Sequence, residues 1–328
     1  AENVNEVVTI CNKLDGIPLA VELVASRTKH MNARTILERF SDRFDQLASF
    51  DPDASKRQQT LQATIDWSYN LLSDVEKLLF VRLAVFSGGF DIEAAEEVCS
   101  DDLLPKEDIL DVLSRLVDRS LVNTTKGGEQ SQRYNRLETL RQFAWKKLQT
   151  QNEEEVIRQR HLEYYCKLSE QAYKEQFQSQ LKWLNKLEQE HDNLVAALNW
   201  SSTESKTKFI LLAGYLGWFW YLHSHLILGK DYLEKAISED SEKSEAYARV
   251  LAELGRLAFY TTEKSEPIEF MKESLGIWRK TNNLREQAIV LSSLGRHASR
   301  TDDPEMVLKY NEESMQLARK VGDQGLAN

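Results

Sequence analysis

The sequence predicts a mainly α-helical fold: a helical subdomain, a winged helix with a small β-hairpin wing, and an α-helical repeat array. Three observations support this prediction. Glycine and proline are scarce, at 13 and 5 of 328 residues, while charged residues make up 29% and hydrophobic residues 41%, a balance typical of helical proteins in contact with water. Apolar residues recur with the helical period along most of the chain. The last third repeats itself at an offset of about 40 residues.

Residues 1–50 predict a helical subdomain built around a tight turn. An apolar stripe with i, i+3, i+4, i+7 spacing predicts a first helix that ends near Leu14. Gly16 then occupies the position at which a left-handed residue commonly ends a helix. Pro18 occupies the first position of a new helix, where no N–H donor is needed. We expect a second helix with Leu19 directed inward, and a third helix after it.

Residues 51–150 predict a winged-helix domain. The segment SDVE (73–76) has the pattern of a capping box, in which a serine caps a backbone N–H and a glutamate reaches back. Two further helices follow. Two short strand patterns then flank the polar segment KGGEQS (126–131), which predicts a β-hairpin. The segment TLRQ (139–142) predicts a second capping box at the start of the last helix.

The remaining chain predicts a helical connector over 151–205 and stacked helix pairs over 206–328. The segment ARVLAELGRLAF (248–259) matches AIVLSSLGRHAS (288–299) at the same phase. Helix pairs that repeat with this period stack into a solenoid, because one pair cannot bury its own apolar face. We expect the array to continue in a longer parent protein. Leu-Gly pairs mark the register of the repeats: 216–217, 254–255 and 294–295.

Composition narrows the class of protein. The formal net charge is −10, so the chain as a whole repels nucleic-acid phosphates unless basic residues gather on one face. Three dispersed cysteines predict reduced thiols. The sequence shows neither a secretion signal nor a membrane span. We therefore expect a cytoplasmic protein without a membrane partner.

Several blocks in order resemble one family. The segments LDGIPLAVELVASR (14–27), LVDRSLV (116–122), RYNRLETLRQFAWKKL (133–148) and LEQEHDNLVAALNW (187–200) resemble the bacterial STAND signalling ATPases. These are relatives of the NB-ARC modules of plant disease-resistance proteins and of large tetratricopeptide-bearing transcriptional regulators. The resemblance covers essentially the whole chain. It implies a tetratricopeptide-like array that senses an inducer or a protein partner.

The resemblance also implies a nucleotide switch. In the family, a helical subdomain and a winged helix fold over ADP or ATP with Mg²⁺, bound by a nucleotide domain that precedes them. Gly16, Pro18 and Leu19 would then lie near the adenine, at a helix N-terminus that is locally positive. This arrangement requires the Ile-Pro corner and the wing to face one shared surface. The partner of this chain would be that nucleotide domain of the same protein.

The sequence departs from the family pattern at the nucleotide. It contains no G-x-x-x-x-G-K-[ST] phosphate loop, so we expect no cofactor and no enzymatic activity in this fragment, whose parent would be the ATPase switch. The family's Met-His-Asp motif would fall at 136–138, which places Leu137 where the motif has histidine. Arg136 and Arg141 are the candidates for positive charge on the phosphate side.

The alternative function is a transcription factor that binds DNA through the winged helix. Its candidate recognition helix carries Asp108, Asp111 and Asp118, opposed by Arg115 and Arg119. Phosphate contact needs clustered basic residues, so this pattern favours a packing role and indicates no direct DNA binding by the fragment.

Aromatic and histidine residues supply the remaining candidate sites. An aromatic cluster in the first repeat is a candidate partner-binding surface, but aromatic residues on repeat helices more often fill the core, and the sequence favours core filling. It comprises Tyr215, Trp218, Phe219, Trp220 and Tyr221, and all of these except Phe219 are the candidate partner-binding residues. His223 and His225 are expected to point to different faces of one helix. Since no histidines pair at i, i+4, the sequence predicts no metal site.

Overall fold

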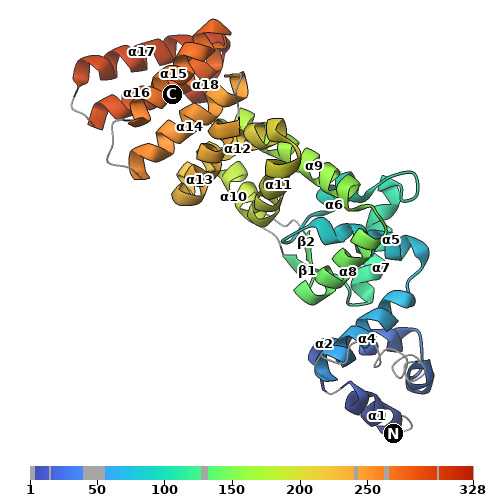
Figure 1. The fold of residues 1–328 in the computed structure, drawn as a ribbon. Helices are drawn as coiled ribbons and strands as arrows, with labels where there is room; N and C mark the ends of the chain where they lie inside the picture. The colour runs from blue at the N-terminus through green and yellow to red at the C-terminus, as the bar shows by residue number, and fades with distance from the viewer. Residues whose placement is uncertain are drawn as a thin grey trace. The chain divides into compact units, whose positions relative to one another are not determined.

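The computed structural model describes residues 4–14, 16–39, 56–126, 132–239, 243–261, 266–300 and 303–327. The chain divides into two compact units, Ala1–His161 and Leu162–Asn328 (Figure 1). The division lies inside the long helix α9 (Glu154–Glu175) and within the predicted connector. The described residues are mainly helical, as predicted, with one two-stranded sheet. None of their helices has both the length and the apolar character needed to cross a bilayer.

The N-terminal helices form as the sequence predicts. Helix α1 (Val4–Lys13) is followed by Gly16 with a φ of +62°, the left-handed conformation that glycine adopts without a Cβ penalty. Pro18 is the first residue of α2 (Pro18–Ala25), and the short η1 (Ser26–Lys29) continues it. Residues 33–39 are helical, which confirms the third helix. Apolar side chains from these elements and Trp67 form one buried cluster.

The winged helix consists of a helical core and a hairpin. Its elements are α4 (Lys56–Asn70), α5 (Asp74–Arg82), η2 (Leu83–Val85), α6 (Ile92–Cys99), η3 (Lys106–Asp108), α7 (Ile109–Asp118), β1 (Asn123–Lys126), β2 (Gln132–Asn135) and α8 (Glu138–Thr150). The strands pair antiparallel with Asn123 opposite Asn135, which confirms the hairpin. Phe90 adds an isolated bridge to Tyr134, so the hairpin is attached to the segment that precedes α6.

One capping prediction is confirmed and one is wrong. Ser73 caps α5: its backbone N–H donates to Glu76 at 2.8 Å, and its hydroxyl accepts from the Glu76 N–H at 3.4 Å. Helix α8 instead begins at Glu138 without a side-chain cap, so Thr139 lies inside the helix. The physical reason is that Gln142, the expected reciprocal partner, donates to the Glu138 carboxylate at 3.0 Å.

Helix pairs build the second unit. Its elements are the end of α9, α10 (Gln180–Gln189), α11 (His191–Glu204), α12 (Lys206–Leu222), α13 (Leu226–Glu239), α14 (Glu245–Thr261), α15 (Glu266–Lys280), α16 (Leu284–Arg300), α17 (Pro304–Val321) and α18 (Gln324–Ala327). Consecutive helices pack together as pairs, and α14 also contacts α12 and α16. Contacts between α12, α14 and α16, each the first helix of its pair, are what a solenoid requires.

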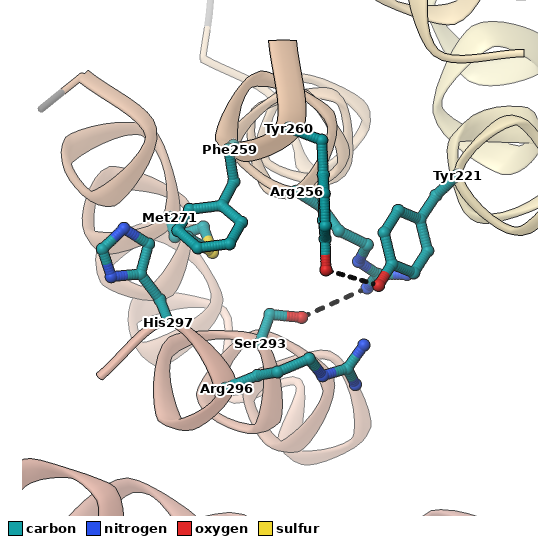
Figure 2. Close-up of a pocket in the computed structure, with 9 residues that line it drawn as sticks. Tyr221, Arg256, Phe259, Tyr260, Met271, Ser293, Arg296 and His297 are labelled. Atoms are coloured by element: carbon teal, nitrogen blue, oxygen red, sulfur yellow. Dashed lines mark hydrogen bonds between the residues drawn. The ribbon is translucent and has the colours of Figure 1, made fainter. Parts of the chain in front are cut away.

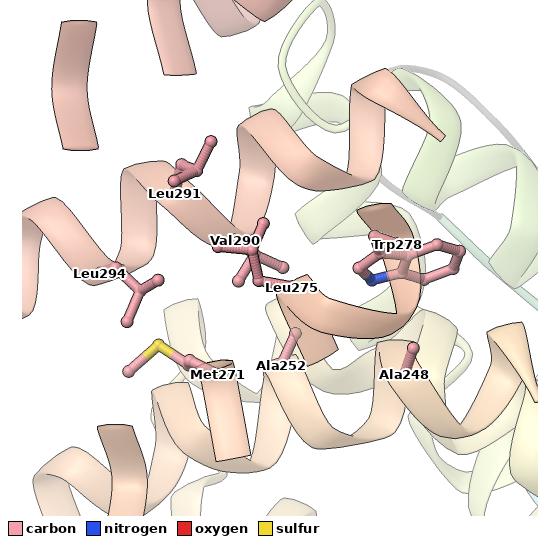
Figure 3. Packing of buried hydrophobic residues seen from close by; sticks show 8 residues of the cluster. All are labelled: Ala248, Ala252, Met271, Leu275, Trp278, Val290, Leu291 and Leu294. Atoms are coloured by element: carbon pink, nitrogen blue, oxygen red, sulfur yellow. The ribbon is translucent and has the colours of Figure 1, made fainter. Parts of the chain in front are cut away.

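Buried apolar residues join α14, α15 and α16 into one core (Figure 3). Trp278 is fully buried within it. The Leu-Gly register has a packing reason: a Cβ on Gly255 would lie 2.7 Å from the Pro267 carbonyl oxygen and from Met271 Cγ of α15. The glycine therefore allows the two helices of a pair to approach closely.

Candidate functional site: a cationic and aromatic pocket on the repeats

A pocket on the repeat array gathers side chains from α12, α14, α15 and α16 (Figure 2). Its empty space is about 300 Å³, a figure that includes open solvent at its mouth. Arg256 and Arg296 each follow the glycine of a Leu-Gly pair, so equivalent positions of successive repeats line the same pocket. The lining residues are Tyr221, Gly255, Arg256, Phe259, Tyr260, Met271, Ser293, Arg296 and His297.

Arg256 is the largely buried cation at the side of the pocket. Its Nη2 atom donates to the Ser293 hydroxyl at 3.3 Å (Figure 2), and its Nη1 atom lies 3.4 Å from Glu253 Oε2. Its guanidinium also lies 5.9 Å from the centroid of the Tyr221 ring. Only 12% of the side chain is exposed, so an anion that reaches Arg256 meets a positive charge that water screens weakly.

Two tyrosine hydroxyls meet at the rim of the pocket. The Tyr221 and Tyr260 hydroxyl oxygens lie 3.0 Å apart (Figure 2). Partial burial acts to raise the pKa of the Tyr221 phenol, but hydrogen bonds with Tyr260 and Arg296 lower that pKa below its ordinary value. The hydrogen bond to Tyr221 raises the pKa of Tyr260. Either hydroxyl can donate in this contact, so the pair can both donate to and accept from a polar group at the rim.

A buried charged network lies beside the pocket. The Glu253 carboxylate is 1% exposed, and neither oxygen has a hydrogen-bond partner among the described residues. Burial raises the pKa of Glu253. On the same helix, Arg249 donates to Glu286 at 3.2 Å, and Glu286 accepts a second hydrogen bond from the Tyr173 hydroxyl at 2.7 Å. This network links α14 and α16 to α9 within the second unit.

The chemistry of the pocket favours a small anion attached to a flat apolar group. Arginine forks bind carboxylate and phosphate oxygens, and aromatic rings receive the apolar part of a ligand. The sequence signal for these cations was the repeated Leu-Gly-Arg triplet at 254–256 and 294–296. The Leu-Gly pairs were interpreted as markers of the repeat register alone, and the arginines that follow them were not predicted as site residues.

The predicted aromatic surface separates into a core part and a pocket part. Trp218 and Trp220 are each 1% exposed and fill the core between helices. Their burial agrees with core filling, the interpretation that the sequence favours, and leaves them out of reach of a partner in this conformation. Tyr221 lines the pocket, as above. Tyr215 is half-buried, with its ring centroid 4.6 Å from the Arg249 guanidinium.

No described residue of the first unit covers the predicted adenine-proximal corner at Gly16 and Pro18. Gly16 and Pro18 are exposed, and a Cβ built on Gly16 would have no neighbour within 4 Å. Leu19 is half-buried, although we expected it to point inward. The tip of the wing, residues 127–131, lies outside the described residues, so the predicted shared surface of corner and wing stays a prediction.

Arg136 and Arg141 are engaged inside the winged helix. Arg136 donates to the Phe80 and Leu83 carbonyl oxygens, near the end of α5. Arg141 forms a two-pronged ion pair with Glu138 at 2.7 and 2.8 Å. Carbonyl groups at a helix end attract cations, which accounts for the position of Arg136. Both guanidinium groups therefore already have structural partners: Arg136 has carbonyl oxygens and Arg141 has the Glu138 carboxylate. Their predicted position beside a phosphate therefore stays a prediction.

The candidate recognition helix α7 packs within its own unit at its C-terminal end. Arg119 forms a 3.0 Å ion pair with the buried Glu76, and its carbonyl accepts from the Ser26 hydroxyl at 3.1 Å. Lys29 lies 3.4 Å from Asp118. Both arginines expected to oppose the acidic residues thus lie beside Glu76: Arg119 at 3.0 Å and the more exposed Arg115 at 3.9 Å.

The prediction that His223 and His225 point to different faces of one helix is wrong. Both rings approach the Glu188 carboxylate, and these three side chains form a group that could hold a metal ion. The helix that we extended through them ends at Leu222. Residues 223–225, which follow it, do not continue the helical period, so helical spacing could not place the two rings.

Comparisons with known proteins support the fold of the first unit. Residues 72–149 match the family described as a winged helix-turn-helix domain. Over 231 residues, the chain is 38% identical to a Mycobacterium tuberculosis protein named as a candidate HTH-type transcriptional regulator; the match covers 70% of this chain and 26% of the relative. An uncharacterized M. tuberculosis protein is 38% identical over 157 residues, 46% of this chain and 39% of the relative. The chain spans about a quarter of the length of the first relative.

A solved structure was also found. It is the crystal structure of a signal transduction ATPase with numerous domains (STAND) that carries a tetratricopeptide repeat sensor, from Pyrococcus horikoshii. The alignment covers 95% of this chain and 55% of that chain, with 14% sequence identity and a TM-score of 0.36.

Proposed function

We propose that this chain is the regulatory and sensor portion of a STAND-type signalling ATPase that acts in transcription regulation. The observation that carries the proposal is the pocket in which equivalent arginines of successive repeats, Arg256 and Arg296, share one space with tyrosine hydroxyls. A sensor needs a ligand site on its repeats, and this pocket offers charge and aromatic contact together. The fragment itself has no catalytic role in this proposal.

The first unit would act as a clamp on a nucleotide domain elsewhere in the parent protein. The exposed corner at Gly16 and Pro18 is available to an adenine, with Leu19 beside it. ADP or ATP with Mg²⁺ would be bound by that domain, whose phosphate loop this chain lacks. The clamp and the array would then communicate through the parent protein, in the cytoplasm.

The proposed switch depends on competition for one cation. An anion in the pocket would compete with Glu253 for Arg256, whose Nη1 atom lies 3.4 Å from that carboxylate. Displaced Glu253 would then disturb the buried network of Arg249 and Glu286, which reaches α9 through Tyr173. A ligand shifts the switch only if it binds one arrangement more tightly than the other.

The alternative function is direct DNA binding. The match of residues 72–149 to the winged helix-turn-helix family and the name of the first relative favour it. The acidic residues of α7 and the internal pairing of Arg119 oppose it.

A mobility-shift titration of this chain with duplex DNA at low salt separates the two functions. We expect no retarded complex at protein concentrations up to about 10⁻⁵ M, because even non-specific DNA binders reach roughly 10⁻⁴–10⁻⁶ M at physiological salt and bind more tightly at low salt. A complex that weakens with added salt and with Arg115→Ala would favour the alternative.

A further inference from the structure

Three side chains converge at the junction between the connector and the first repeat. His225 Nε2 lies 2.9 Å from Glu188 Oε2, and His223 Nδ1 lies 3.3 Å from the same oxygen. All three ligand-capable atoms lie within 4.8 Å of one another. The two histidine side chains are each 28% exposed and the glutamate is 44% exposed, so the group is reachable from solvent.

The backbone fixes the two histidines on one side. Helix α12 ends at Leu222, and the His225 N–H donates back to the Trp220 carbonyl at 2.9 Å. This is the 6→1 bond of a Schellman motif, which needs a left-handed residue at the penultimate position. Ser224 supplies it, with a φ of +62°. The His225 carbonyl in turn accepts from the Gly229 N–H at 2.9 Å as α13 begins, so the chain is held on both sides of His225.

The rings also rest on packed neighbours. The His223 and His225 rings lie nearly parallel, with centroids 6.3 Å apart and a 12° angle between their planes. The buried Phe219 ring lies 5.2 Å from the first and 5.6 Å from the second. His191 stacks on His225 at 4.6 Å. These contacts restrict the rotamers of both ligands before any ion arrives.

We propose that Glu188, His223 and His225 bind one divalent transition-metal ion of the zinc class, which fastens α10 to the turn between α12 and α13. Neutral imidazole nitrogens and a carboxylate oxygen are the ligands such an ion prefers, and two histidines with one glutamate form a recognised zinc set. Zinc–ligand bonds of about 2.0–2.1 Å with tetrahedral angles place neighbouring ligand atoms about 3.3 Å apart. The observed separations need only small side-chain adjustments to reach that geometry. A water molecule would complete the coordination, since the three side chains are partly exposed.

Metal-free chain, prepared with EDTA and without a histidine tag, is titrated with Zn²⁺ by calorimetry and with Co²⁺ by visible absorption. We expect one ion per chain, a Co²⁺ spectrum of a low-coordinate site, and a higher melting temperature with Zn²⁺. The double variant His223→Ala/His225→Ala should lose affinity by at least about 100-fold, since second-shell changes alone cost about 10–100-fold. His30→Ala, which removes an exposed histidine of the first unit, should bind as the parent does.

The variant Glu188→Gln distinguishes the loss of a metal ligand from a loss of folding. Its amide oxygen can still accept a hydrogen bond from the histidines, so the metal-free variant should melt as the parent does. We expect its Zn²⁺ affinity to fall by more than about tenfold. The proposal would be overturned if the unsubstituted chain had no one-to-one site. It would also be overturned if the Zn²⁺ affinity survived both Glu188→Gln and the double histidine variant.

Discussion

Replacing Arg82 by leucine should lower the unfolding free energy of the first unit by about 3 kcal/mol, within the range for breaking a buried ion pair. Arg82 is 2% exposed and joins the end of α6 to the segment that precedes α9. Its Nη2 atom lies 2.5 Å from Asp101 and 2.9 Å from Glu153, and its Nη1 atom donates to the Cys99 carbonyl at 2.8 Å. The variant leaves two carboxylates and a carbonyl without their cation.

The same variant should change the response of the first unit to acid. The hydrogen bond from Arg82 lowers the pKa of Asp101, with burial opposing it. A carboxyl group whose pKa is lower in the folded state than in the unfolded state stabilises the fold at pH values above its unfolded pKa. That stabilisation is lost as the pH falls through the folded-state pKa. The difference in unfolding free energy between the unsubstituted chain and Arg82→Leu should therefore shrink at pH values below the ordinary pKa range of aspartate.

Chemical denaturation followed by circular dichroism measures the effect of Arg82→Leu at neutral and acidic pH. Lys106→Ala is the matched control, because the Lys106–Glu97 pair of 2.5 Å joins side chains that are 50% and 46% exposed. Exposed pairs contribute less than about 1 kcal/mol. Equal losses in the two variants would contradict the assignment of Arg82 as the buried centre of the winged helix.

Replacing Glu286 by leucine should lower the unfolding free energy of the second unit by about 3 kcal/mol. Glu286 is 5% exposed and accepts from both Arg249 and Tyr173. Leucine fills a similar volume but leaves a buried guanidinium and a buried hydroxyl without their acceptor. Because the network joins α9 to α14 and α16, we expect the loss to reduce the cooperativity of unfolding as well.

Glu313→Leu is the matched control for the repeat network. Glu313 pairs with Arg279 at 2.6 Å, but the two side chains are 36% and 52% exposed, so its loss should cost less than about 1 kcal/mol. Thermal unfolding monitored by calorimetry compares the two variants. A Glu286 variant as stable as the Glu313 variant would show that the buried network does not hold the array together.

Local patterns predicted most of the helices, because capping and periodicity act over a few residues. Ser73 and Glu76 are three residues apart, and their reciprocal bonds form as predicted. The repeats were visible because the Leu-Gly pairs recur at one phase, and Gly255 has a packing reason to recur. The failed capping box has the same local cause, since Glu138 takes the hydrogen bond that Gln142 was expected to direct elsewhere.

The candidate sites could not be predicted as far, because they depend on chain reversals and on contacts distant in sequence. His223 and His225 share a side only because Ser224 adopts a left-handed conformation, which serine rarely does. Arg82 and Glu153 are 71 residues apart. Periodicity also could not distinguish Trp220, which is buried, from Tyr221, which is one residue later and lines the pocket.

The most direct test of the sensor proposal is a thermal-shift titration of the chain with a panel of small anions: inorganic phosphate, benzoate, 4-hydroxybenzoate and nucleoside monophosphates. We expect at least one aromatic anion to raise the melting temperature, since saturation at 100 times Kd stabilises by about 2.7 kcal/mol. Arg296→Ala should weaken that ligand at least about tenfold, the loss of one charge-assisted hydrogen bond. Arg319→Ala, an exposed arginine of α17, should not. A panel without any stabilising anion, or stabilisation that Arg296→Ala leaves intact, would contradict the account.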